Sequence, residues 1–144
     1  LDLITGGSGQ DVILGEGGND NIDGGEGNDS ILGGLGNDLL TGGGGNDTLC
    51  GEAGADVFVF SDLANLDGST DMVLDFERGL DRIDLRGLGL RYIGSAPLTG
   101  AGLVNRETVG GDQRLVIDRD GDGQADLTIR LGSIDPIGAS DLLL

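Results

Sequence analysis

Carboxylates recur every nine residues along the first part of this chain. Six aspartates follow this spacing: Asp11, Asp20, Asp29, Asp38, Asp47 and Asp56. Residues 1–60 hold 11 acidic side chains and no Lys, Arg or His, so this segment has no side chain that neutralises them. Carboxylate oxygens are ligands that calcium prefers in proteins. The spacing and the charge together predict a segment that binds several calcium ions.

Each of these aspartates ends a glycine-rich block of six residues. The blocks read GGSGQD (6–11), GEGGND (15–20), GGEGND (24–29), GGLGND (33–38), GGGGND (42–47) and GEAGAD (51–56). Three residues follow each block, and the middle one is always apolar: Ile13, Ile22, Ile31, Leu40, Leu49 and Phe58. Asp2 and Ile4 fit the end of a seventh, truncated block. Glycines permit positive φ, so each block is expected to form a turn and the next three residues a short strand.

Two such units make one coil of two turns and two strands, and successive coils stack as parallel sheets. Residues i and i+18 then lie ~4.8 Å apart, which leaves room for a calcium ion, with Ca–O distances of ~2.4 Å, between stacked carboxylates. The complete pairs are Asp11/Asp29, Asp29/Asp47, Asp20/Asp38 and Asp38/Asp56, and a fifth, Asp2/Asp20, lacks its first glycine turn. Turn carbonyls complete each site, from the glycines Gly24, Gly25, Gly27, Gly33, Gly34, Gly36, Gly42, Gly43 and Gly45. We therefore expect about four or more calcium ions.

The interior of this stack is a thin double row of the six apolar residues, with Ile4 at its end. So small a core does not offset the entropy of ordering many glycines, and the carboxylates on each edge repel one another. Calcium binding would supply much of the folding free energy. We predict that residues 1–60 are disordered without calcium.

The blocks resemble GGxGxDxUx, the nonapeptide repeat of the RTX (repeats-in-toxin, hemolysin-type) calcium-binding family, over residues 2–59. The resemblance implies a parallel β-roll in which the six repeat aspartates and turn carbonyls hold calcium. Two blocks depart from the pattern because Glu16 and Glu52 stand at the second glycine position. The sixth block also has Ala53 and Ala55, as is common where a roll ends.

Beyond Phe58 the period stops, and short alternating runs predict further strands. The runs GADVFVF (54–60) and DFERGLDRIDL (75–85) resemble the C-terminal domain of serralysin-type metalloproteases and the calcium-binding modules of mannuronan epimerases. By that resemblance Asp71, Asp75 or Asp81 caps the last calcium sites. The fold expected is all-β: a parallel β-roll, residues 1–60, that continues into a C-terminal β-sandwich-like cap, residues 61–144.

Three arginines, Arg78, Arg82 and Arg86, fall four residues apart. One interpretation is a basic face for an acidic polysaccharide. The favoured one is local pairing with Glu77, Asp81 and Asp84, which suits a chain of formal charge −18.

A second acidic motif lies at 118–126, inside RLVIDRDGDGQADLTIRL (114–131). Asp118, Asp120, Asp122, Gly123 and Asp126 match positions 1, 3, 5, 6 and 9 of an EF-hand loop, but Ile129 replaces the final Glu. The flanks alternate like strands, so an EF-hand is excluded. The loop is either an acidic hairpin turn, the favoured interpretation, or an additional weak calcium site.

Composition excludes several classes of function. Absence of His argues against Ser-His-Asp and zinc catalysis, the negative charge argues against nucleic acid, and no apolar stretch reaches the ~20 residues of a membrane span. Cys50 is the only cysteine, and we interpret it as a small side chain on a strand. The chain therefore carries no credible catalytic set and is not expected to be an enzyme.

The chain ends in ASDLLL, an acid followed by three apolar residues. This ending resembles the terminal secretion signal of serralysin-like type I substrates, and it implies the type I secretion apparatus as a partner. We interpret the chain as the calcium-binding C-terminal module of a secreted, extracellular bacterial protein, with any catalytic domain upstream. The alternatives are a polysaccharide-binding module of an extracellular enzyme such as a mannuronan epimerase, or an adhesin module.

Overall fold

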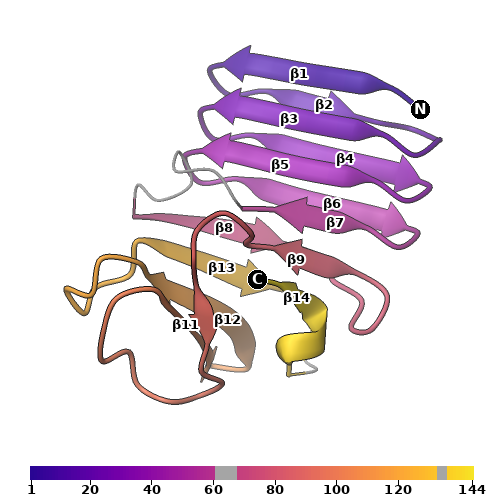
Figure 1. Cartoon of the computed structure of the whole chain (residues 1–144). Coiled ribbons are helices and arrows are strands. Elements are labelled where there is room, and N and C mark those ends of the chain that lie inside the picture. The colour runs from indigo at the N-terminus through magenta and orange to yellow at the C-terminus, as the bar shows by residue number, and fades with distance from the viewer. Residues whose placement is uncertain (61–67, 133–135) are drawn as a thin grey trace.

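The computed structural model describes residues 1–60, 68–132 and 136–144, and these form two facing β-sheets (Figure 1). Sheet A contains, in spatial order, β1 (Leu3–Ser8), β3 (Asn21–Glu26), β5 (Leu39–Gly44), β7 (Val57–Val59), β9 (Arg82–Asp84) and β14 (Leu142–Leu143). Sheet B contains β10 (Arg91–Tyr92), β11 (Leu103–Val109), β12 (Asp112–Asp118), β13 (Leu127–Leu131), β8 (Ser69–Val73), β6 (Thr48–Ala53), β4 (Ser30–Leu35) and β2 (Val12–Leu14). The predicted all-β parallel roll is confirmed.

The pairing register of the repeats is i to i+18, as predicted. In sheet A, Ile22 pairs with Leu40, and Leu40 pairs with Phe58. In sheet B, Ile31 pairs with Leu49. The six apolar repeat residues are at most 7% exposed and belong to one core cluster. The two rows therefore meet between the sheets and form the thin interior that the repeat pattern predicts.

The repeat strands are longer than the three residues expected from sequence. Strands β3 to β6 each have six residues, because the first positions of the block that follows each of them continue the parallel ladder. Gly7 pairs with Gly25, and Gly25 pairs with Gly43. A glycine backbone can lie in such a ladder with its neighbour's carbonyl directly against its Cα, where a side chain would not fit. The turns are correspondingly shorter than six residues.

The two sheets continue without a break past residue 60. Strand β9 extends sheet A beside β7, and β8 extends sheet B beside β6, both in parallel. Strands β11, β12 and β13 then form an antiparallel meander whose last strand pairs in parallel with β8. The core is also continuous, and the rings of Phe58 and Phe76 have centroids 6.3 Å apart. The division into 1–60 and 61–144 stays a prediction about independent folding units.

The C-terminal residues complete sheet A instead of projecting from it. A 3-10 turn, η2 (Ala139–Asp141), leads into β14, which pairs in parallel with β9 (Figure 1). The carbonyl of Ile137 accepts hydrogen bonds from Tyr92 Oη at 3.2 Å and Arg106 Nη1 at 3.0 Å. Among the described residues we find no helix with the length and apolar character that a membrane crossing requires.

Candidate metal centre

One edge of the roll carries a ladder of aspartates that we call the first column: Asp11, Asp29, Asp47 and Asp71. Each member donates its backbone N–H to Oδ1 of the next. The N···O distances are 2.9 Å for Asp11 to Asp29, 2.8 Å for Asp29 to Asp47 and 2.9 Å for Asp47 to Asp71. The column therefore extends one member beyond the repeats, to Asp71, 24 residues after Asp47.

The opposite edge carries a second column: Asp2, Asp20, Asp38, Asp56 and Asp81. Its backbone N–H to Oδ1 distances are, in chain order, 2.6, 2.8, 2.8 and 3.0 Å. Asp81 closes the column, since its own N–H donates to the carbonyl of Glu77 at 2.9 Å. The structure thus brings all six predicted aspartates into the two columns and adds Asp71 and Asp81.

The carboxylates of both columns are buried except at their N-terminal ends, where Asp2 is exposed and Asp11 is half-buried. Exposure is 3% or less for Asp20, Asp29, Asp38, Asp47, Asp56, Asp71 and Asp81. Residues 2–60 contain no Lys, Arg or His, and the amino group of Leu1 lies 3.4 Å from Oδ1 of Asp20. Burying a carboxylate without a compensating cation costs several kcal/mol, roughly, even after relaxation. Rows of such groups therefore require a cation.

The second carboxylate oxygens identify where that cation fits. Oδ2 of Asp11, Asp20, Asp29 and Asp38 is buried and accepts no hydrogen bond from the described residues. At Gly6, a Cβ atom would lie 2.7 Å from Oδ2 of Asp11 and 2.5 Å from the carbonyl oxygen of Gly24. At Gly33, it would lie 2.5 Å from Oδ2 of Asp38 and 3.0 Å from the carbonyl oxygen of Gly51. Oxygens of two successive coils thus gather where glycine leaves space, which is a donor set suited to calcium.

The glycines at the second and fourth positions of each block have left-handed backbone. The predicted residues have φ of 101° at Gly25, 106° at Gly34, 103° at Gly43, 135° at Gly27, 136° at Gly36 and 116° at Gly45. A Cβ at any of these positions would collide with a backbone carbonyl of the preceding coil. Glu16 and Glu52 adopt the same region, with φ of 67° and 66°. The two departures from the glycine pattern therefore keep the turn and hold non-glycine residues in a strained conformation.

Crowding of carboxylates changes proton affinity at the closed end of the second column. Burial raises the pKa of Asp56 to about 6, and the neighbouring charges of Asp81 and Asp38 act in the same direction. Burial likewise raises the pKa of Asp81, to which the charges of Asp75 and Glu77 contribute. Like charges held together in a buried site favour proton or metal binding.

A family profile for the RTX calcium-binding nonapeptide repeat (4 copies) matches residues 2–31 and 23–58. Residues 2–58 carry this repeat, whose description is calcium-binding. The match contains Asp2 and the six repeat aspartates of the two columns, whereas Asp71 and Asp81 lie beyond it. The predicted resemblance to the RTX family is confirmed.

Two of the solved structures that match this chain come from one enzyme. The AlgE6R2 subunit of the Azotobacter vinelandii mannuronan C5-epimerase is 29% identical, with a TM-score of 0.73, and the match covers 98% of this chain and 91% of that one. The AlgE6R3 subunit of the same epimerase is 27% identical, with a TM-score of 0.38, and the match covers 99% of this chain and 78% of that one. No curated protein matches the sequence. The RTX roll and its cap together thus resemble one epimerase subunit.

Asparagines in the turns of the RTX repeats form a second ladder that sequence reasoning missed. Oδ1 of Asn28 accepts the N–H of Asn46 at 2.9 Å, and Oδ1 of Asn46 accepts the N–H of Thr70 at 2.8 Å. On the other edge, Oδ1 of Asn19 and of Asn37 act alike. The signal was the recurrent Asn directly before Asp at 19, 28, 37 and 46.

Asp75 lies outside both columns and holds the last repeat turn. Its carboxylate accepts the N–H of Gly51 at 3.0 Å, the N–H of Glu52 at 2.7 Å and the thiol of Cys50 at 3.0 Å. Burial and the neighbouring carboxylate of Asp75 raise the pKa of Cys50 to about 12. Cys50 lies on β6 and is an unreactive thiol in this setting.

The three evenly spaced arginines bind groups of the protein itself, as the favoured interpretation predicts in part. Arg86 pairs with Asp84 at 2.6 Å, and this guanidinium lowers the pKa of Asp84. Arg82 donates to the backbone carbonyl of Asp81 at 2.7 Å. Arg78 pairs with the distant Asp141 at 3.5 Å instead of Glu77. Because these contacts occupy the three guanidinium groups, they weaken the interpretation of the arginines as a polysaccharide-binding face.

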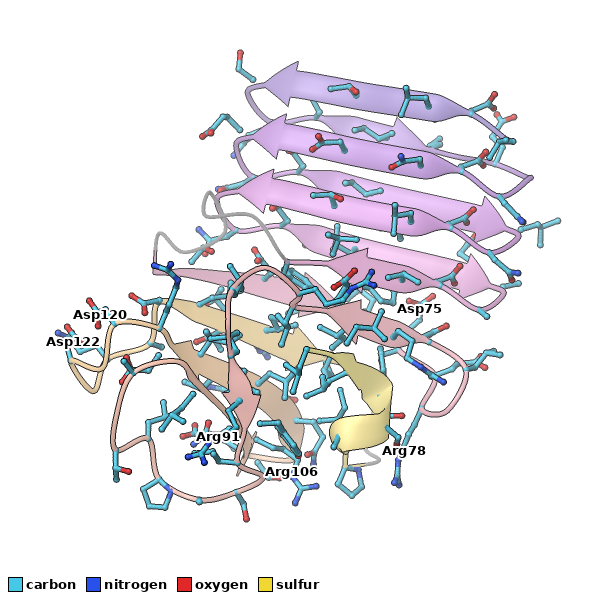
Figure 2. The ribbon with its side chains drawn as sticks, in the orientation of Figure 1. Asp75, Arg78, Arg91, Arg106, Asp120 and Asp122 are labelled. Carbon is cyan, nitrogen blue, oxygen red and sulfur yellow. The ribbon has the colours of Figure 1, made fainter. Side chains whose placement is uncertain are left out.

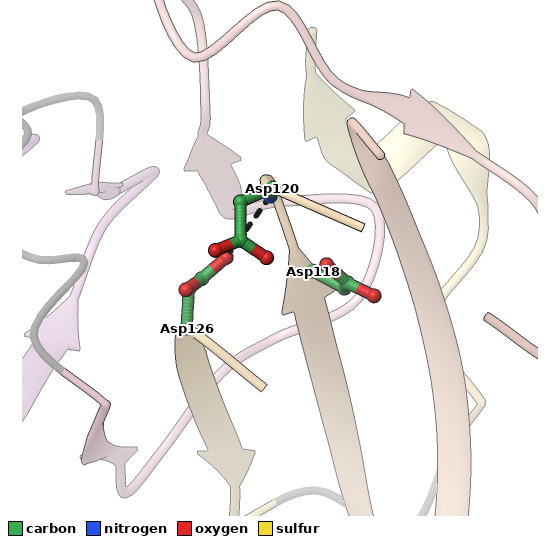
Figure 3. Close-up of side chains that lie close together, drawn as sticks. All are labelled: Asp118, Asp120 and Asp126. Carbon is green, nitrogen blue, oxygen red and sulfur yellow. Dashed lines mark hydrogen bonds between the residues drawn. The ribbon is translucent and has the colours of Figure 1, made fainter. Parts of the chain in front are cut away.

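The acidic loop at 118–126 connects the antiparallel strands β12 and β13, which agrees with the hairpin interpretation. Ligand oxygens of Asp118, Asp120 and Asp126 lie within 4.8 Å of one another (Figure 3). Asp118 is fully buried, but its oxygens accept the N–H groups of Gly121 at 2.6 Å and Gly123 at 3.0 Å. Calcium binding at this loop stays a prediction.

Proposed function

We propose that the two Asp columns bind a stack of calcium ions and that the roll folds when they bind. One observation carries the proposal: buried carboxylates are stacked along both edges, with orphaned Oδ2 atoms and no basic side chain in residues 2–60. Calcium supplies the positive charge that these edges lack. The proposed ligands are the aspartates of the two columns, which include the six repeat aspartates, and the carbonyls of the repeat glycines named above.

The columns contain seven stacked pairs: Asp2/Asp20, Asp11/Asp29, Asp20/Asp38, Asp29/Asp47, Asp38/Asp56, Asp47/Asp71 and Asp56/Asp81. Four of them are the complete pairs expected from the repeats. The pairs that end in Asp71 and Asp81 have the same N–H to Oδ1 contact, so we include them as sites. Each aspartate inside a column serves two sites, which makes binding along a column cooperative.

Folding is coupled to calcium because the free energy of folding the roll without metal is unfavourable. Left-handed glycines carry a large ordering entropy, and the buried carboxylates repel one another. Extracellular calcium modules have dissociation constants of about 10⁻⁴–10⁻³ M, so the roll remains unfolded at low calcium and folds outside the cell. The module would then stabilise its parent protein and favour one-way export by a type I secretion apparatus.

Circular dichroism and calorimetry of the full chain test the calcium proposal. Sheet content should rise on calcium addition and disappear with a chelator, whereas a spectrum that ignores calcium would refute coupled folding. Replacement of Asp29 and Asp38 by Ala should lower the calcium stoichiometry. Asp23→Ala is the matched control, because Asp23 is exposed on β3 and belongs to neither column.

Export is tested separately by deleting Asp141–Leu144 in the secreting host. Loss of export with unchanged calcium stoichiometry supports the role of the C-terminus in type I secretion. Export at the normal level would show that the signal lies elsewhere.

A second candidate function is a polysaccharide-binding module of an extracellular enzyme. Its support is the similarity, over 98% of the chain, to a subunit of a mannuronan C5-epimerase. Exposed Arg91 on β10, in the cap, gives such a ligand a cation that no ion pair of the described residues occupies. Binding of mannuronan to the calcium-loaded chain, weakened by Arg91→Ala, would support this candidate, and absence of binding would remove it.

A further inference from the structure

The C-terminal residues are anchored to a single turn of the roll. Asp141 is 1% exposed, and its Oδ1 accepts the N–H of Gly79 at 3.2 Å. Its Oδ2 accepts the N–H of Gly138 at 2.8 Å and lies 3.5 Å from Nε of Arg78. Figure 2 shows Arg78 beside the turn that precedes the last strand. The acid of the C-terminal sequence is therefore a buried anchor.

The apolar residues that follow are also used inside the fold. Leu142 is 7% exposed and belongs to the core cluster. The carbonyl of Leu143 accepts the N–H of Leu85 at 2.8 Å, which joins β14 to the chain after β9. We call residues 136–144 the tail. In the folded protein neither its acid nor its first leucine is available to a partner.

The turn that holds the tail is the one that closes the second column. This closing turn, residues 77–81, ends in Asp81. Oδ1 of Asp81 accepts the N–H of Asp56 at 3.0 Å, and Oδ2 accepts the N–H of Glu77 at 2.8 Å. The same short segment thus contains the last aspartate of the second column and two of the partners of Asp141, Arg78 and Gly79.

We infer that calcium at the Asp56/Asp81 pair controls whether the tail is docked or released. With calcium, the closing turn is ordered and holds Asp141, so β14 completes sheet A. Without it, two buried carboxylates face each other without a cation, the closing turn loses its support, and the tail detaches. Release exposes an acidic residue followed by leucines. This inference rests on the proposed calcium function.

Thermodynamic linkage determines how a partner that binds the tail and calcium affect each other. A partner that binds the released tail excludes the docked state, so it lowers the affinity of the Asp56/Asp81 pair for calcium. Calcium lowers the affinity of the tail for that partner by the same factor. A partner that recognises an acidic residue followed by apolar residues therefore binds the calcium-free chain, and calcium withdraws that motif into sheet A.

Amide hydrogen exchange of the full chain in saturating calcium tests the coupling. Asp81→Asn keeps an acceptor for the N–H of Asp56 and removes the negative charge. It should speed amide exchange at Leu85, Leu142 and Leu143 by about tenfold or more. Asp11→Asn is the matched control, since Asp11 lies at the far end of the other column, and it should leave these amides unchanged. Equal release by both variants, or no release by Asp81→Asn, would overturn the inference.

The anchor itself is tested by Arg78→Gln and Asp141→Asn, which should free the tail while calorimetry still detects calcium in the first column. The control is Arg82→Gln. Among the described contacts, the guanidinium that it removes touches only the Asp81 carbonyl. A tail that stays protected in Arg78→Gln and Asp141→Asn would refute the anchor. A chain that binds no calcium would refute the proposed function, whereas calcium binding with an unresponsive tail would refute this inference alone.

Discussion

Replacement of Asp38 by Asn isolates the electrostatic role of one column residue. Oδ1 of Asp38 accepts the N–H of Asp20 at 2.8 Å, and the N–H of Asp38 donates to Asp56 at 2.8 Å. Asn retains an acceptor and the same backbone donor, so both contacts survive. The variant loses only the negative charge and the orphaned Oδ2.

The size of the effect follows from the position of Asp38 between two stacked pairs. Removing one partner of a buried charge pair costs about 2–5 kcal/mol, so the lower bound for two pairs is about 4 kcal/mol. If all seven pairs fill cooperatively with folding, this cost is about 0.6 kcal/mol per ion, and the calcium midpoint rises about threefold. Without calcium the sign reverses, because the variant removes one repelling carboxylate.

Circular dichroism during a calcium titration measures both parts of this prediction. Asp38→Asn should shift the midpoint to higher calcium, and in chelator it should be at least as ordered as the parent chain. Asp23→Asn removes the same formal charge from an exposed position and should leave the midpoint unchanged.

Two results would refute the reasoning. An unchanged midpoint would mean that Asp38 does not bind metal, so the columns would be structural ladders only. An equal midpoint shift in Asp23→Asn would mean that net charge alone moves the midpoint, and the role assigned to the position of Asp38 would be wrong.

Four further predictions test the repeat turns and the strand β6 beside them. Gly25→Ala should destabilise the calcium-loaded protein by about 2–4 kcal/mol in thermal unfolding, because Gly25 has φ of 101° and a Cβ there meets the Gly7 carbonyl. Glu16→Gly should stabilise the protein by about 0.5–1 kcal/mol in the same measurement, because it relieves the φ of 67° at Glu16. Cys50 has its pKa raised from 9.0 to about 12, so it should be alkylated at pH 8 about 100- to 1,000-fold more slowly in the folded protein than in chelator. Asp75→Asn should speed alkylation of the folded protein. Equal alkylation rates in calcium and in chelator would show that the thiol is free. Asn46→Ala should cost about 1 kcal/mol in denaturant unfolding through loss of the 2.8 Å hydrogen bond from Thr70, and no change would make the asparagine ladder incidental.

The repeated part of the fold was predictable because identical units leave only one consistent stacking. An 18-residue coil places Ile22 against Leu40 and Asp20 against Asp38, and both pairs are observed. The glycine pattern also predicted where backbone must approach backbone. It did not predict that the first glycines of a block, such as Gly24 and Gly25, belong to the strands, since their propensity alone favours a turn.

The cap was less predictable because its contacts join residues without a common spacing. Arg78 was expected to pair locally, yet it meets Asp141, and the neighbouring Gly79 donates its N–H to the same carboxylate from 62 residues away. The end of the chain was interpreted only through its resemblance to a secretion signal, because three leucines after an acid have no period that reveals the strand β14. Long-range partners of this kind are determined by the packed core and not by local sequence.

Loss of sequence periodicity at Phe58 does not end the spatial periodicity. The next members of the columns, Asp71 and Asp81, lie 24 and 25 residues after their neighbours instead of 18, yet each accepts the same backbone N–H at 2.9 and 3.0 Å. What the columns preserve is therefore the stacked carboxylate itself, while the chain between two members can lengthen. In the calcium stack that we propose, a carboxylate with that contact marks a site, so the last two proposed sites lie where the roll meets the cap.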